Sequence, residues 1–236
     1  MQDNALRLSL LGGLEIGRAH TRVNLPLGAQ RLLALLALQN GWIHRSTAAE
    51  RLWPDSLRNR APANLRSALW KASRIGDVVA IESTGARLRL QPGIEVDLRS
   101  ILERIRHIGD GGGLGDEAET IIAALSRELL PDWSDEWLRL ERERWDQVRT
   151  HTLESLAQQL MAAGRYLLAL EAASAAVAVE PVRESAHRAV IEVYIAEGNG
   201  ACALKHYQRY RGLVQRELGV TPSQRMNRLI QPLTAR

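Results

Sequence analysis

The sequence predicts a mainly α-helical protein with a small β component, in which an N-terminal winged helix-turn-helix precedes a C-terminal tetratricopeptide-like helical bundle. Three observations support this fold class. Short alternating segments, three helical segments and a hairpin pattern follow one another within the first hundred residues. Basic residues are concentrated around the third helical segment. Glycine and alanine positions recur in the second half with the 34-residue period of tetratricopeptide repeats.

The predicted elements of the first hundred residues come in the order strands, three helices and hairpin. Alternating leucines bounded by Gly12-Gly13 are typical of short antiparallel strands, and a leucine-rich helical segment then ends at Asn40-Gly41. These elements are expected as strands at 6–11, 14–16 and 23–25, helices at 28–39, 46–53 and 62–75, and a hairpin at 78–90. A helix-turn-helix followed by a hairpin is the layout of a winged helix.

The boundaries of the second and third helices rest on capping and proline signals. Ser46 or Thr47 can cap the second helix, with Glu50 completing a capping box after Thr47. Pro54 ends that helix, and Pro62 suits the first turn of the next. The length of 236 residues allows two modest domains, which we expect at residues 1–98 and 99–236.

The net charge of +4 is too small to indicate a partner, but its distribution is uneven. Residues 1–100 carry a net charge of +6 and residues 101–236 carry −2. The segment 51–74 alone carries +5, which is the electrostatic footprint of a polyanion-binding site. A solvated basic face that binds nothing is the alternative interpretation.

A helical wheel divides the third helix into two faces. Leu65, Leu69 and Ala72 share the face expected to pack on the other helices, whereas hydrogen-bond donors and a tryptophan lie opposite. Arginine can bind guanine in the major groove, serine and asparagine can bond bases or phosphates, and lysine suits phosphate. Arginines of the hairpin suit the backbone or the minor groove. The predicted DNA-binding residues are Arg58, Arg60, Asn64, Arg66, Ser67, Trp70, Lys71, Arg74, Arg87 and Arg89.

The second half is predicted to be helical, after a glycine-rich connection at 109–116. This connection lacks the Gly-Lys-Ser/Thr ending of a phosphate-binding loop. Gly164 recurs as Gly198 and Ala169 as Ala203, each 34 residues later, which predicts paired helices that cross closely. The tryptophans at 133, 137 and 145 are expected to pack in the interior rather than form a ligand cage. This half is interpreted as an interaction or dimerisation module.

Other functional classes find little support in the sequence. No HExxH, GxSxG or Walker lysine is present, and the six histidines lack metal-ligand spacing, so neither catalysis, a cofactor nor a metal site is expected. Cys202 is the single cysteine, which excludes a disulfide framework. The most apolar run, Leu32–Leu38, is too short to span a membrane, and the N-terminus lacks a secretion-signal pattern. We therefore expect a cytoplasmic protein without membrane contact.

Four motifs resemble the Streptomyces antibiotic regulatory protein family. They are Gln30–Leu38, Glu50–Pro54, Leu65–Lys71 and Arg216–Ser223, and the resemblance covers nearly the whole chain. It is closest to the short form without an ATPase module, in which an OmpR-like winged helix joins a bacterial transcriptional activation domain. The resemblance implies an activator that binds direct repeats in duplex DNA near promoters and recruits RNA polymerase. It also implies that the loop 55–60 contacts polymerase or the DNA backbone.

One departure from the family pattern supports an alternative function. Ala72-Ser73-Arg74 follows Lys71, where the family usually has an apolar residue and two arginines, so a bulky core residue and one charge are missing. The alternative is a tetratricopeptide interaction module whose DNA binding is weak or lost. A DNA-binding assay at about 0.1 M salt separates the two hypotheses. Direct-repeat DNA also favours head-to-tail pairing of two copies, as a homodimer on DNA.

Overall fold

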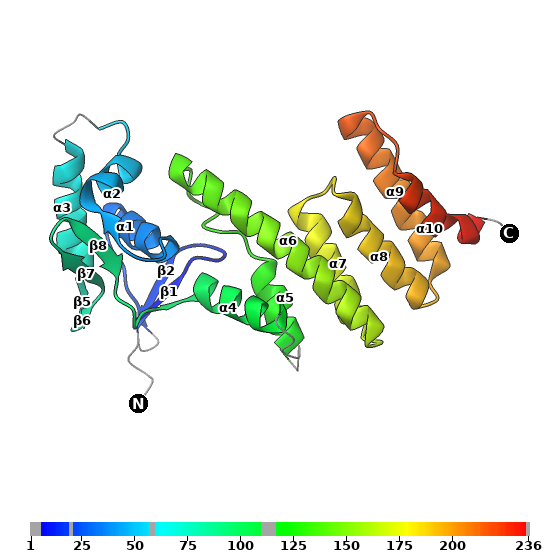
Figure 1. Cartoon of the computed structure of the whole chain (residues 1–236), viewed down its shortest axis with the longest axis horizontal. Helices are drawn as coiled ribbons and strands as arrows, with labels where there is room; N and C mark the ends of the chain where they lie inside the picture. The colour runs from blue at the N-terminus through cyan, green and yellow to red at the C-terminus, as the bar shows by residue number, and fades with distance from the viewer. Residues whose placement is uncertain (1–5, 19–20, 57–59, 110–116, 235–236) are drawn as a thin grey trace. The chain divides into compact units, whose positions relative to one another are not determined.

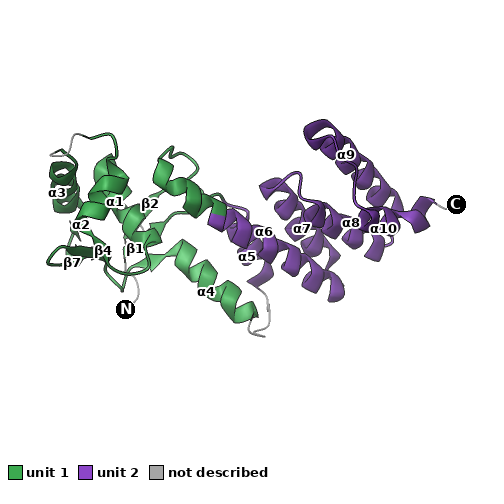
Figure 2. Ribbon diagram, turned by 45° about the horizontal axis from the view of Figure 1, so that its top comes forward, with its two compact units in different colours: residues 1–110, 128–143 green, residues 111–127, 144–236 purple. Residues whose placement is uncertain are grey.

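The computed structural model describes residues 6–18, 21–56, 60–109 and 117–234, which are mainly helical, as predicted. The chain forms two compact units, shown in different colours in Figure 2. Unit 1 comprises Met1–Asp110 and Glu128–Glu143, and unit 2 comprises Gly111–Arg127 and Arg144–Arg236. Each unit therefore draws on two separate stretches of sequence. The domain boundary at residue 98 stays a prediction.

Unit 1 contains a four-stranded sheet built around β1. Its strands, in the order β3-β2-β1-β9, are Thr21–Arg22, Glu15–Arg18, Leu6–Ser9 and Glu95–Val96. β1 is antiparallel to β2, with Leu8 opposite Ile16, and parallel to β9. Leu6, Leu8 and Ile16 are buried, so the alternation in the sequence marks one face turned to the core.

Three helices and two smaller sheets complete the N-terminal part of unit 1 (Figure 1). The helices are α1 (Leu27–Leu38), α2 (Arg45–Leu52) and α3 (Arg60–Ala72). One sheet joins β4 (Ile43–His44), β8 (Arg87–Leu90) and β7 (Ile81–Thr84), and the other pairs β5 (Arg74–Ile75) with β6 (Val78–Val79). α1 packs against both α2 and α3. The predicted order of elements is therefore present. The strand expected at 23–25 lies instead at Thr21–Arg22, and Val78–Val79 pairs with β5 rather than with the hairpin.

Two predicted helix boundaries are wrong. The N-cap of α2 is His44, whose Nδ1 accepts a hydrogen bond from the backbone N–H of Ser46, so neither Ser46 nor Thr47 is the cap. α3 ends at Ala72 rather than near Ile75. The residues after Ala72 form β5 because Gly76, with φ of +62°, turns the chain back so that Arg74 pairs with Val79.

Residues 128–143 belong to unit 1 because they bond to its first strand and the following turn. The Leu130 N–H donates to the Leu10 carbonyl, and the Gly12 N–H donates to the Glu128 carbonyl. Arg142 donates to the backbone carbonyls of Leu129, Leu130 and Trp133. The backbone hydrogen bonds that join this segment to the first strand therefore link residues that are far apart in the sequence.

The Asp97 side chain binds the backbone just after β1. Asp97 is the first residue of α4 (Asp97–Gly109), and its Oδ1 accepts hydrogen bonds from the N–H groups of Leu10 (2.8 Å) and Leu98 (2.7 Å). Its Oδ2 accepts from the Leu11 N–H at 3.1 Å. One carboxylate thus holds the end of the sheet against the first turn of α4.

Unit 2 is a stack of helices, and each of its last four helices packs against the next. Its helices are α5 (Ala118–Leu125), most of α6 (Arg139–Ala162), α7 (Tyr166–Val179), α8 (Glu184–Ala196), α9 (Gly200–Leu218) and α10 (Gln224–Thr234). Four alanines of α7 are fully buried, which lets its neighbours approach closely. Gly164 and Gly198 have φ of +72° and +87°, a conformation that glycine adopts without strain at helix ends. Trp145 is buried, as expected, and donates to the Arg127 carbonyl.

A histidine pair lies between α8 and α9. His187 Nδ1 is 2.9 Å from His206 Nε2, and His187 Nε2 is 2.8 Å from the carbonyl oxygen of Pro181. Tyr210 stacks on His187 and carries a hydroxyl near Glu184. Burial, with the nearby charges of His187 and Arg209, lowers the pKa of His206 to about 4, and burial also lowers the pKa of His187.

We predict that Asp97→Ala lowers the free energy of unfolding by about 1–3 kcal/mol, because the partly buried N–H groups of Leu10, Leu11 and Leu98 lose their acceptor. Urea unfolding followed by circular dichroism measures the change. Glu95→Ala is the matched control, since its ion pair with Arg7 is exposed and contributes about 0–1 kcal/mol. Equal effects of the two substitutions would contradict the role assigned to Asp97.

The histidine pair predicts acid-sensitive stability. The folded protein keeps both rings neutral below the ordinary pKa of histidine, whereas the unfolded chain binds protons there, so stability falls as the pH drops from about 6.5 toward 4. Urea midpoints at pH 7 and pH 5 measure this loss. The double variant His187→Gln/His206→Gln should show a smaller difference between the two midpoints; an unchanged difference would rule the pair out as its source.

Candidate nucleic-acid interface

α3 has one buried and one exposed face, as its sequence predicts. The buried side chains are Ala61, Leu65, Ala68, Leu69 and Ala72. The exposed ones include most of the predicted DNA-binding residues, namely Arg60, Asn64, Arg66, Ser67, Trp70 and Lys71. The packing that holds the helix in place therefore leaves its polar face free.

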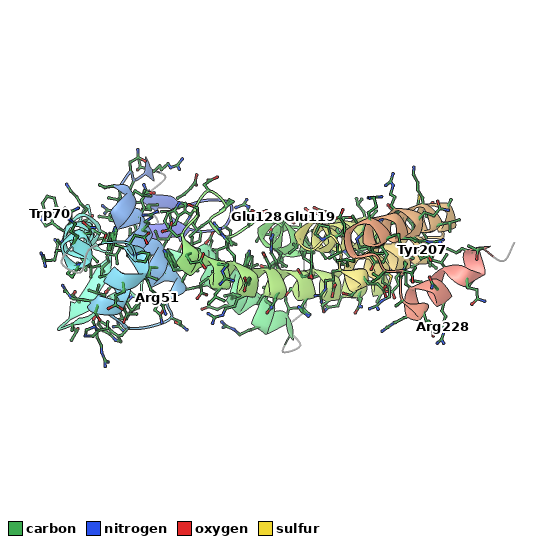
Figure 3. The ribbon with its side chains drawn as sticks, turned by 90° about the horizontal axis from the view of Figure 1, so that it is seen from above. Arg51, Trp70, Glu119, Glu128, Tyr207 and Arg228 are labelled. Carbon is green, nitrogen blue, oxygen red and sulfur yellow. The ribbon has the colours of Figure 1, made fainter. Side chains whose placement is uncertain are left out.

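Trp70 is the most unusual residue of this face. Its side chain is 75% exposed, although tryptophan is usually largely buried in a folded protein. The ammonium nitrogen of Lys71 lies 4.2 Å from the centre of the Trp70 ring. Figure 3 shows Trp70 on the outer side of α3. A cation and a large apolar surface are thus presented together to a partner.

A shallow groove of about 320 Å³ runs beside Trp70. Its lining residues come from α2, α3 and the following strands and are Arg45, Arg66, Leu69, Trp70, Ser73, Ile81 and Ser83. The guanidinium of Arg45 donates to the Ser83 hydroxyl at 2.8 Å and so links the start of α2 to β7. Two arginines and two serines therefore meet along one edge of α3.

Arg45 is the functional candidate that the sequence analysis missed. Its place in the sequence, just before Ser46 and Thr47, gives no sign that its charge lies beside α3. The antiparallel pairing of β7 with β8 brings Ser83 within reach of Arg45. No spacing in the sequence indicates this contact, because it joins residues 38 positions apart.

The remaining predicted residues differ in their surroundings. Arg74 is exposed but lies on β5, so its predicted place on the third helix is wrong. Arg87 is exposed on β8, whereas Arg89 bonds Glu82 at 2.6 Å and its guanidinium lies 4.5 Å from the Trp42 ring. Arg58 lies outside the described residues. Arg89 is therefore held within the hairpin, while Arg87 is available to a partner.

Other kinds of site are not visible in the described part of the chain. It contains no cluster of three histidine, cysteine, aspartate or glutamate side chains that could hold a metal ion. No helix in the described ranges is long and apolar enough to cross a membrane.

We predict that Arg89→Ala lowers the free energy of unfolding by about 1 kcal/mol, because it removes a cross-strand ion pair and a contact with Trp42. Arg87→Ala, two residues away on the same strand, should change it by less than about 0.5 kcal/mol. Thermal unfolding of both variants tests the difference. A larger loss for Arg87→Ala would reverse the two assignments.

Comparison with a solved structure supports the fold. Mycobacterium tuberculosis EmbR in complex with a low affinity phosphopeptide matches this chain with a TM-score of 0.74 and 20% sequence identity. The match covers 97% of this chain and 64% of EmbR. The two proteins therefore share a fold over nearly all of this chain.

Sequence comparisons identify the family. The regulatory protein AfsR of Streptomyces coelicolor is 27% identical over 242 residues, and AfsR of Streptomyces griseus is 25% identical over 239 residues. These matches cover 98% and 97% of this chain but only 24% of each AfsR, so the chain spans about a quarter of the length of these relatives. The bacterial transcriptional activator domain matches residues 116–234. The chain belongs to the bacterial transcriptional activator domain family, and its similarity to AfsR supports the resemblance to the Streptomyces antibiotic regulatory protein family.

Proposed function

We propose that the chain is a transcriptional activator that binds specific sequences in duplex DNA. In this proposal residues 1–98 form a winged helix-turn-helix in which α2 and α3 are the helix pair and β7–β8 is the wing. Residues 99–236 form the tetratricopeptide-like activation domain. The exposed face of α3 is the observation that carries the proposal, since it combines basic, polar and aromatic side chains on a helix whose other face is buried.

The side chains of α3 suit the chemistry of the major groove. Arg66 can bond the O6 and N7 atoms of guanine, and Asn64 and Ser67 can bond base edges or phosphates. Lys71 suits a phosphate, while the exposed ring of Trp70 offers apolar contact to a thymine methyl group or a sugar. Arg45 and Arg87 lie on α2 and β8 and suit the flanking backbone.

Binding to direct repeats and recruitment of RNA polymerase complete the proposal. Family membership supports both steps, and such a regulator acts in the cytoplasm, where bacterial DNA lies. Two copies on a direct repeat would meet head to tail, as a homodimer on DNA. The turn after α2 offers a polymerase contact, because a recess of about 430 Å³ there is lined by Trp53, Pro54 and Ser56 together with the start of α3.

The alternative is an interaction module with weak or lost DNA binding. It is supported by the small side chain of Ala72, where the family usually has a bulky apolar residue. Ala72 is fully buried, so its small size alters the packing of α3 and leaves the outward charges in place. The small residue therefore affects the packing of α3, and the alternative still predicts weak or lost DNA binding.

We predict that Arg66→Ala/Lys71→Ala weakens binding to a duplex selected from a random pool by at least about tenfold, because a base contact and a phosphate contact are lost. Fluorescence anisotropy at about 0.1 M salt measures the dissociation constant. The control Arg7→Ala/Arg106→Ala removes two exposed cations from elsewhere in unit 1. The proposal fails if the α3 variant and the control bind equally well.

A further inference from the structure

The second half of the chain contains a basic segment that its average charge conceals. Residues 198–236 carry a net charge of +6, with Glu217 as their single acidic residue. Residues 101–197 carry −8. The C-terminal helices thus concentrate as much positive charge as the segment around α3, and the proposed function gives this charge no role.

Part of this charge forms a stripe along α9. At about 100° per residue, Lys205, Arg209 and Arg216 lie within about 40° of one another on the helix. All three are exposed, whereas Ala203, Tyr210 and Val214 on the opposite side are buried in the core. The stripe therefore lies on the solvent side of α9, and we call these three residues the α9 stripe.

The cations of α9 and α10 form no ion pairs with the described residues. This holds for Lys205, Arg209, Arg211, Arg216, Arg225 and Arg228. The neighbouring helix α8 behaves differently, because Arg188 pairs with Glu192 there. Just before α8, Arg183 pairs with Glu154 and Glu180. Cations without a carboxylate partner leave their field directed into solvent, where a polyanion can be attracted.

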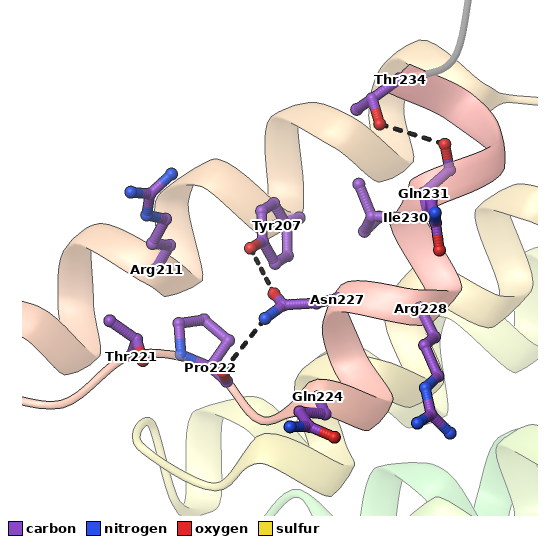
Figure 4. A pocket seen from close by; sticks show the side chains of 10 residues that line it. All are labelled: Tyr207, Arg211, Thr221, Pro222, Gln224, Asn227, Arg228, Ile230, Gln231 and Thr234. Carbon is purple, nitrogen blue, oxygen red and sulfur yellow. Dashed lines mark hydrogen bonds between the residues drawn. The ribbon is translucent and has the colours of Figure 1, made fainter.

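A cavity of about 640 Å³, open to solvent, lies between α9 and α10 (Figure 4). The Tyr207 hydroxyl donates to Asn227 Oδ1 at 2.7 Å in its centre. Arg211 and Arg228 stand on opposite sides of the cavity, and their side chains point away from each other. Cations that diverge in this way suit several anionic groups spread along a surface better than one small anion.

The composition of this surface favours nucleic acid over protein. Protein interfaces can include arginine, but they depend on buried aromatic or aliphatic anchors at their centre. The α9 stripe carries no large apolar side chain, and the exposed Leu218 and Val220 lie beyond it. Phosphate backbones, in contrast, are bound by arginine and lysine together with hydroxyl and amide side chains.

We propose that α9 and α10 form a second, sequence-independent binding surface for the phosphates of duplex DNA. The proposal rests on the proposed function, because a chain held on DNA by α3 keeps its C-terminal helices at a high effective concentration of the same duplex. The second surface adds affinity and salt dependence, and it leaves the choice of sequence to α3.

The test compares the unaltered chain with Lys205→Ala/Arg209→Ala/Arg216→Ala. Dissociation constants are measured for the selected duplex and a shuffled duplex over a series of KCl concentrations. Each phosphate contact contributes about 0.9 to the slope of log affinity against log salt, so the variant should lose about 2 to 3 from that slope. Its preference for the selected duplex should stay unchanged. Circular dichroism checks that the variant is folded.

The control Arg106→Ala/Arg139→Ala/Arg165→Ala removes the same charge from exposed positions on other elements. It should keep a slope close to that of the unaltered chain. Equal slopes for the two triple variants would overturn the second surface, as would a loss of sequence preference in the α9 variant. If the unaltered chain binds neither duplex, the proposed function itself fails, and the two failures are thus distinguishable.

Discussion

Burial of the central part of α1 is the constraint on which unit 1 depends. Six consecutive residues, from Leu32 to Ala37, are buried, so this helix needs cover on every side. α2, α3 and β8 supply part of that cover. Arg99 closes its C-terminal end by donating to the carbonyls of Leu36, Ala37 and Gln39. α3 is fixed against α1 by its apolar face, and its polar face is left for a partner.

The arginines of this protein fall into two groups that differ in their partners. Arg99 and Arg142 bond backbone carbonyls, and Arg89 bonds a carboxylate, so these side chains hold the fold together. Burial lowers the pKa of Arg99, which reflects this structural position. Arg66 and Arg209 are exposed and form no ion pair with the described residues. Charge alone therefore identifies no binding site, and the proposed sites are those where charge without a partner lies on an ordered helix.

Local sequence patterns predicted the first strands, the three helices and the hairpin of unit 1, and most of its candidate site. The buried and exposed faces of α3 follow from helical periodicity, and the hairpin follows from Thr84-Gly85 between two apolar runs. The misplaced end of α3 and the unexpected cap at His44 depend on β5 and β4, two-residue strands that carry almost no periodic signal.

The features that the sequence did not predict depend on contacts between distant residues. Leu130 bonds Leu10, and Arg45 bonds Ser83, and no local pattern indicates either pair. Averaging the charge over the second half also hid the basic helices α9 and α10, since the acidic segment before them outweighs their charge. A finer division of the sequence would have revealed that charge, but only the fold shows that the α9 stripe faces solvent.

Directed cleavage of DNA tests the central claim, that α3 lies in the major groove. Ala63 is exposed on α3 and is not among the proposed DNA contacts. In a chain carrying Cys202→Ser, an iron chelate attached at Ala63→Cys should cut the selected duplex at a few adjacent positions within the bound site. The same chelate at Ser174→Cys on α7 provides the comparison. Localised cleavage from α3 alone is the predicted result, and identical, diffuse cleavage from both positions would contradict the account.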